Sequence, residues 1–168
     1  YFREAIPVYL ELIKADPEDF TLVRGFFAAC RSARDYQPAM ELIDQYLAKE
    51  LPSSKGMTPL YLVQNHAFFL SLARDSKALL TFAEKLPDLV RQDQANDEEQ
   101  AELANEYYRA LVALYHERGE ADEELGVLFR LKARKNLTRA EQLEGARIFL
   151  LQGKPAEATE WLEGLELD

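Results

Sequence analysis

The sequence is poor in residues that cross-link a chain, interrupt helices or attract nucleic acid. It has one cysteine, so no disulfide can form within the chain. It has only seven glycines and seven prolines, and we expect these to stand between helices rather than inside them. Asp and Glu outnumber Lys and Arg by 30 to 20. The net charge of −10 disfavours nucleic acid as a partner, because binding to phosphate needs a basic surface.

Long apolar runs are missing too. None approaches the roughly 20 residues of a membrane-spanning helix, so we expect no direct membrane insertion by this segment. The acidic balance also disfavours adsorption to an anionic membrane surface. With 48% hydrophobic and 30% charged residues, the composition is instead that of a folded globular protein.

Signatures of catalysis and of metal binding are absent as well. There is no glycine-rich phosphate loop and no serine-nucleophile motif. His66 and His116 fall on different predicted helices without a second His or Cys at metal spacing, which favours a packing or surface role for each. Cys30 falls on the apolar stripe of its helix, which predicts a buried, unreactive thiol. The sequence therefore predicts a protein that is not an enzyme, with no catalytic residue, no cofactor and no metal site.

Acidic residues gather at two predicted helix starts, 97–99 and 120–124. Negative charge at these places complements the partial positive charge of a helix N-terminus. We expect these carboxylates to have no further role.

What the chain does have is helical periodicity. Apolar residues recur at 3- and 4-residue steps from Arg3 to Ala15 and through most of the chain, which predicts an all-α protein. Thr58 and Pro59 read as an N-cap and a first-turn proline. Thr138 with Glu141 has the spacing of a capping box.

The middle of the chain departs from this regular pattern. Pro87 indicates a break or kink, and the polar stretch 91–100 is typical of an irregular connection. A helix from about Asp97 to Arg118 is expected next. It is longer than its neighbours, which indicates a local change in how the helices stack.

The C-terminal part of the chain resembles itself at a distance of 34 residues. Each copy is a helix, a glycine-containing turn and a second helix, the size and form of a tetratricopeptide repeat. The matching pairs are Gly119 with Gly153, Tyr115 with Phe149, Leu128 with Leu162 and Leu131 with Leu165.

On these residues the chain resembles the tetratricopeptide repeat (TPR) superfamily. The last unit matches best, because small Ala146 and Ala158 suit the close approach of its two helices, whereas Val112 and Glu124 occupy those places one unit earlier. The resemblance implies a TPR-like right-handed α-solenoid of about nine antiparallel helices, four pairs after a leading half repeat. We expect one repeat domain over 1–168, cut from a longer protein, with units at about 1–17, 20–53, 58–90, 97–136 and 138–168.

The resemblance also implies a binding groove, because TPR proteins bind partners through fixed positions of the first helix of each pair. Four arginines fall on these positions in a chain of net charge −10. We therefore expect the groove to bind an acidic or acidic-apolar segment of a partner protein, the alternative being that the arginines pair with neighbouring glutamates. The candidate partner-binding residues are Arg24, Arg31, Gln64, Phe68, Arg109, His116 and Arg147.

Function is thus expected to be that of a non-catalytic protein–protein interaction scaffold. The chain is similar to the periplasmic TPR regions of bacterial outer-membrane proteins that export exopolysaccharide, of the Pel or cellulose type. This similarity favours the periplasm over the cytoplasm and suggests a role in exopolysaccharide secretion. Two alternatives stay open: a cytosolic assembly or regulatory TPR adaptor, and direct binding of a polysaccharide to Tyr61, Phe68, Tyr107 and Tyr108.

Overall fold

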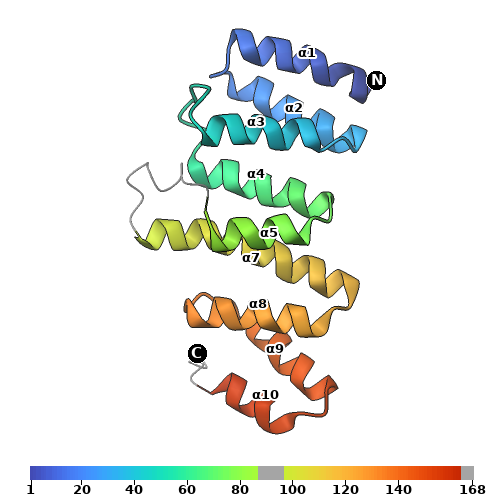
Figure 1. Ribbon diagram of the computed structural model, residues 1–168, viewed down its shortest axis with the longest axis vertical. Helices are drawn as coiled ribbons and strands as arrows, with labels where there is room; N and C mark the ends of the chain where they lie inside the picture. The colour runs from blue at the N-terminus through green and yellow to red at the C-terminus, as the bar shows by residue number, and fades with distance from the viewer. Residues whose placement is uncertain (87–96, 164–168) are drawn as a thin grey trace. The chain divides into compact units, whose positions relative to one another are not determined.

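The computed structural model describes residues 1–86 and 97–163 and shows an all-α protein. Within these two ranges there are nine helices and no strand (Figure 1), as the periodicity predicts. None of the described helices is both long and apolar enough to cross a bilayer. The helices are α1 (Phe2–Ala15), α2 (Phe20–Ala33), α3 (Gln37–Leu47), α4 (Pro59–Leu72), α5 (Ser76–Glu84), α7 (Asp97–Arg118), α8 (Ala121–Ala133), α9 (Arg139–Leu151) and α10 (Pro155–Leu162).

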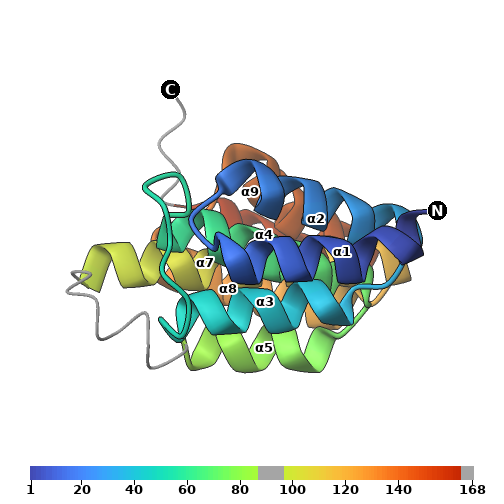
Figure 2. The ribbon, with the colours of Figure 1, turned by 90° about the horizontal axis from the view of Figure 1, so that it is seen from above.

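The chain forms two compact units, residues 1–110 and 111–168, and the boundary falls inside the long helix α7. In the first unit α1 to α5 pack in chain order, each against the next (Figure 1). Seen from above, α2 and α4 lie on one side of this unit and α3 and α5 on the other (Figure 2). This two-layered succession is compatible with a helical repeat.

The core of the first unit is built from the apolar stripes that the sequence predicts. Val23, Phe26 and Cys30 of α2 are fully buried, as is Ile43 of α3. Burial raises the pKa of the Cys30 thiol to about 12, which keeps it protonated at neutral pH. The expectation of a buried cysteine is therefore confirmed.

The core of the second unit centres on Trp161, the only tryptophan of the chain. Its ring lies across Gly145 of α9, and its indole N–H donates to the Gln142 carbonyl oxygen at 2.7 Å. The side-chain ammonium of Lys132 sits 4.7 Å from the ring centroid. Around Trp161 pack Leu125, Leu128, Ala146, Ile148, Phe149 and Ala158.

Helix starts and turns follow the local signals. The Thr58 hydroxyl accepts the Tyr61 N–H at 3.1 Å and caps α4. Gly119 and Gly153 both adopt the left-handed conformation, with φ of 69° and 71°, so the two repeat copies share the same turn geometry. The predicted break at Pro87, most of the polar connection 91–100 and the Leu131–Leu165 match involve residues outside the described ranges.

One expectation about helix breakers is wrong. Pro7, Gly25, Gly126 and Gly145 all lie inside helices rather than between them. Two of these glycines have a packing reason: Gly25 lies against the ring of Tyr9, and Gly145 lies against Trp161. A side chain at either place would occupy the volume of the aromatic ring, so the close approach outweighs the lower helix propensity of glycine.

The capping box of α9 carries a testable expectation. The Thr138 hydroxyl accepts the Glu141 N–H at 3.2 Å, and the Glu141 carboxylate accepts the Thr138 N–H at 2.8 Å. Thr138→Ala is expected to lower the free energy of unfolding by about 1 kcal/mol, because an N–H at the helix start loses its acceptor. Urea denaturation measures this, with Thr159→Ala on the exposed face of α10 as a control expected to change stability by less than about 0.5 kcal/mol. Equal losses in the two variants would contradict a capping role.

Candidate partner-binding surface

Helices α2 and α4 are joined by aromatic rings. Phe20 of α2 meets Tyr61 of α4 edge-on, with ring centroids 5.0 Å apart. Phe27 of α2 contacts both Tyr61 and Phe69 of α4, at 6.5 and 5.6 Å between centroids. These contacts hold α2 and α4 next to each other, and their exposed residues Arg31 and Phe68 meet on a shared face.

Four of the predicted partner-binding residues lie on this face. Arg24 and Arg31 project from α2, and Gln64 and Phe68 from α4; all four are exposed. The Arg31 guanidinium lies over the Phe68 ring, 5.8 Å from its centroid, and so bridges the two helices. These four residues are referred to below as the α2–α4 face.

The arginines of the α2–α4 face are not neutralised by carboxylates. In the described part of the chain, Arg24 and Arg31 form no ion pair, and each lies instead over an aromatic ring, Arg24 over Phe20 at 5.8 Å. Both guanidinium groups oppose the rise in the Tyr61 pKa that burial of its hydroxyl causes. Within the described residues, Arg24 and Arg31 therefore do not pair with neighbouring glutamates.

Arg109 differs from the two arginines of the α2–α4 face. It is half-buried on α7 and already has an interaction partner within the chain. The flanking Tyr107 and Tyr108 are buried, at 0% and 5% exposure. Residues 107–109 of α7 therefore face the interior of the first unit more than an exposed binding surface.

His66 belongs to the interior as well. Its side chain is 2% exposed and its Nδ1 lies 2.9 Å from the Tyr107 hydroxyl oxygen. The imidazole also meets the Phe82 ring edge-on, at 4.7 Å between centroids. Of the two roles that the sequence favours for His66, packing or surface, the structure shows packing.

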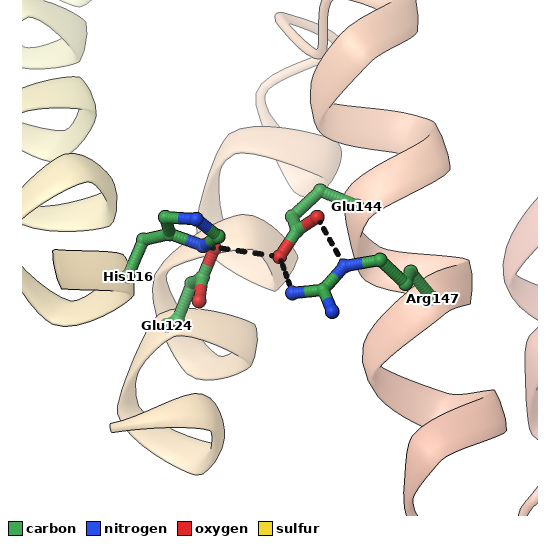
Figure 3. Close-up of polar contacts among 4 residues, drawn as sticks. All are labelled: His116, Glu124, Glu144 and Arg147. Carbon is green, nitrogen blue, oxygen red and sulfur yellow. Dashed lines mark hydrogen bonds and ion pairs between the residues drawn. The ribbon is translucent and has the colours of Figure 1, made fainter. Parts of the chain in front are cut away.

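The other two predicted residues, His116 and Arg147, meet through a carboxylate in the second unit (Figure 3). His116 Nδ1 lies 3.2 Å from Glu144 Oε1, and the same distance separates it from Glu124 Oε1. The Arg147 fork donates to both oxygens of Glu144, at 2.6 and 2.8 Å. These four residues, from α7, α8 and α9, are referred to below as the α7–α9 cluster.

The two carboxylates of the α7–α9 cluster differ in environment. Glu124 is 3% exposed, and burial, followed by the charge of Glu144, raises the pKa of its carboxyl group. Glu144 is more accessible, and the hydrogen bonds from Arg147 lower the pKa of its carboxyl group. The arginine–glutamate pairing considered from the sequence is thus present at Arg147.

Glu124 and Glu144 were not among the predicted site residues. The expectation that the acidic stretch 120–124 serves only the helix start is wrong for Glu124, which points inward and bonds His116. A signal for it exists in the sequence, because small Ala158 stands 34 residues after Glu124, at the matching place of the self-similar stretch. Glu144 carries no such signal, since only the packing of α9 brings it to His116.

Comparison of the chain with protein-family models, with curated proteins and with solved structures gave no match.

Proposed function

We propose that the chain is a non-catalytic interaction scaffold whose α2–α4 face binds an acidic-apolar segment of a partner protein. The observation that carries the proposal is the pair Arg24 and Arg31, exposed, without ion pairs in the described part of the chain, and in a protein of net charge −10. Guanidinium groups suit two-point contacts with carboxylates, and attraction between unlike charges speeds association.

The aromatic residues of the same face add an apolar contact. Phe68 is 43% exposed under the Arg31 guanidinium, and Tyr61 of the same helix is half-buried against Phe20. Arg and aromatic residues are enriched among the residues that dominate binding energy in interfaces. A segment that combines carboxylates with a large apolar residue therefore matches the face.

Membership of the TPR superfamily is part of this proposal. It is supported by the 34-residue self-similarity, by the shared turn conformation at Gly119 and Gly153, and by the two-layered succession of α1 to α5. In such a scaffold, α2 and α4 are the first helices of successive pairs, whose exposed positions line the groove. By the resemblance to exopolysaccharide exporters, the proposed setting is the bacterial periplasm, with a secretion-related protein as partner.

Charge reversal of the α2–α4 face tests the proposal. The double variant Arg24→Glu, Arg31→Glu is expected to weaken binding of the partner at least about tenfold, because two attractive contacts become repulsive. The partner is first captured from lysate of the source organism and identified by mass spectrometry, then produced separately for titration. Binding by the wild-type chain should also weaken as the salt concentration rises.

A matched control separates the face from overall charge. Arg3→Glu, Lys77→Glu makes the same change in net charge at exposed residues of α1 and α5, and should leave the affinity within about twofold. An affinity that falls equally in both double variants would show that binding depends on net charge alone. A partner that binds the Arg24→Glu, Arg31→Glu variant as it binds the wild type would overturn the proposal.

Direct binding of a polysaccharide is the second candidate function. Burial reduces the number of aromatic residues that could take part in it. Of the four aromatic residues proposed as sugar platforms, Tyr107 and Tyr108 are buried, so only Tyr61 and Phe68 are accessible to a polymer. Titration with alginate, an anionic polysaccharide, would distinguish the candidates. Saturable binding that is lost in Phe68→Ala, with no protein captured, favours the polymer.

A further inference from the structure

The α7–α9 cluster has the geometry of an unassigned cation site. One nitrogen of His116 and one oxygen each of Glu124 and Glu144 lie within 4.8 Å of one another, and His116 Nδ1 is 3.2 Å from each carboxylate oxygen. Donor atoms bonded to one zinc ion at about 2.0–2.2 Å are separated from each other by about 3.3–3.6 Å in tetrahedral geometry, close to these distances. Figure 3 shows the imidazole and the two carboxylates pointing toward a common space from three helices.

The charges of the cluster are unbalanced. It contains two carboxylates against one guanidinium, and Arg147 is bonded to Glu144 rather than to Glu124. Glu124 therefore faces a second carboxylate, and it is only 3% exposed to water. A buried carboxylate in this position is unfavourable unless a proton or a cation accompanies it.

The repeat register shows that this arrangement is not required by the fold. One repeat later, the position of Glu124 is held by Ala158, which is 4% exposed and packs in the core of the second unit. An apolar residue thus satisfies the same packing position. Packing alone therefore does not explain why position 124 is acidic. This observation does not depend on the distances within the cluster.

We propose that His116, Glu124 and Glu144 bind one divalent transition-metal ion, with zinc as the expected ion. An imidazole nitrogen and two carboxylate oxygens form a donor set that zinc accepts, whereas magnesium and calcium favour oxygen donors alone. His116 is 56% exposed by its side chain, so water has access to the remaining coordination position. Arg147 holds the Glu144 carboxylate from the outside, as the outer partners of metal ligands do.

Such an ion would connect three helices of the second unit. His116 is in the last turn of α7, Glu124 near the start of α8 and Glu144 in the first half of α9. Because the folded chain binds the ion and the unfolded chain lacks the assembled donors, binding should raise the unfolding temperature. The ion has a structural role in this proposal, and no reaction is assigned to it.

Calorimetric titration of ZnSO₄ into EDTA-treated, dialysed protein tests the site. We expect saturable binding of one zinc ion per chain, and affinities at least about tenfold weaker in His116→Gln and in Glu144→Gln. Glu123→Gln is the matched control, because Glu123 is exposed on α8 directly before Glu124, and its affinity should stay within about twofold of the wild type. Circular dichroism checks that each variant keeps its helices.

A second measurement needs no variant. The chain has two histidines, so imidazole nitrogen NMR signals of ¹⁵N-labelled protein report the site with an internal control. Zinc is expected to shift the His116 signals and to leave those of buried His66 in place. The proposal is overturned if the wild type shows no saturable binding, if His116→Gln binds zinc as the wild type does, or if the His116 signals stay unchanged at saturation.

Discussion

Replacement of Gly145 by alanine is expected to destabilise the second unit by about 1–3 kcal/mol, the usual cost of inserting a carbon atom into a packed core. A β-carbon at this position would overlap the six-membered ring and the indole nitrogen of Trp161. The ring cannot move without cost, because its N–H donates to the Gln142 carbonyl oxygen and Phe129 packs edge-on against it, 5.0 Å between centroids. The loss of these contacts outweighs the gain of about 1 kcal/mol that alanine brings to a helix.

Gly126 provides the matched control for Gly145. It also lies in a helix interior of the second unit, but apart from its chain neighbours and the backbone of its own helix no atom lies within 4 Å of a β-carbon built there. Gly126→Ala is therefore expected to stabilise the chain by about 0.5–1 kcal/mol, opposite in sign to Gly145→Ala. Denaturation followed by the fluorescence of Trp161, the only tryptophan, reads the affected core directly. A stabilising effect of both substitutions would show that Trp161 does not rest on Gly145.

The second large effect is expected from pH. Burial lowers the pKa of His66 to about 4 from its ordinary value of 6.5, even though the Asp44 carboxylate lies 3.8 Å from Nε2. The unfolded chain therefore takes up a proton on His66 at a pH where the folded chain does not. The contribution of His66 to the free energy of unfolding is complete above pH 6.5 and is lost as the pH falls toward 4. The full loss is about 3 kcal/mol, because the pKa of His66 is lowered by about 2.5.

His66→Gln isolates this contribution from that of the carboxylates. Glutamine does not titrate and can still hydrogen-bond the Tyr107 hydroxyl, so the variant is expected to lose less stability than the wild type between pH 6.5 and pH 4. Urea denaturation at several pH values measures the difference between the two proteins. Parallel curves over this range would mean that His66 is accessible to protons in the folded chain.

Local signals in the sequence were enough to predict the helices. Thr138 and Glu141 specify the start of α9, and the predicted long helix has the same bounds, Asp97–Arg118, as α7. Such signals work because capping bonds and apolar periodicity act within about four residues along the chain. The identity of the repeat family, the division into repeat units and the partner are still predictions.

The candidate binding residues were predictable in part. The register implied by the TPR resemblance placed Arg24, Arg31 and Phe68 on an outward-facing surface, and all three are exposed in the structure. Whether such an arginine pairs with a carboxylate was not predictable from the sequence. Arg147 bonds the carboxylate of Glu144, whereas Arg31 lies over the ring of Phe68. That outcome depends on which side chains the neighbouring helices bring within reach.

By itself, then, the sequence determined the all-α class, the approximate positions of the helices and several of their buried stripes. Only the tertiary structure decided how Trp161 lies on Gly145, how His66 meets Tyr107, and how His116, Glu124 and Glu144 converge. The physical reason is that helix formation depends on neighbours in sequence. Contacts between helices depend instead on how far apart packing holds the helices and how each is rotated about its axis, which the bulk of core residues sets jointly.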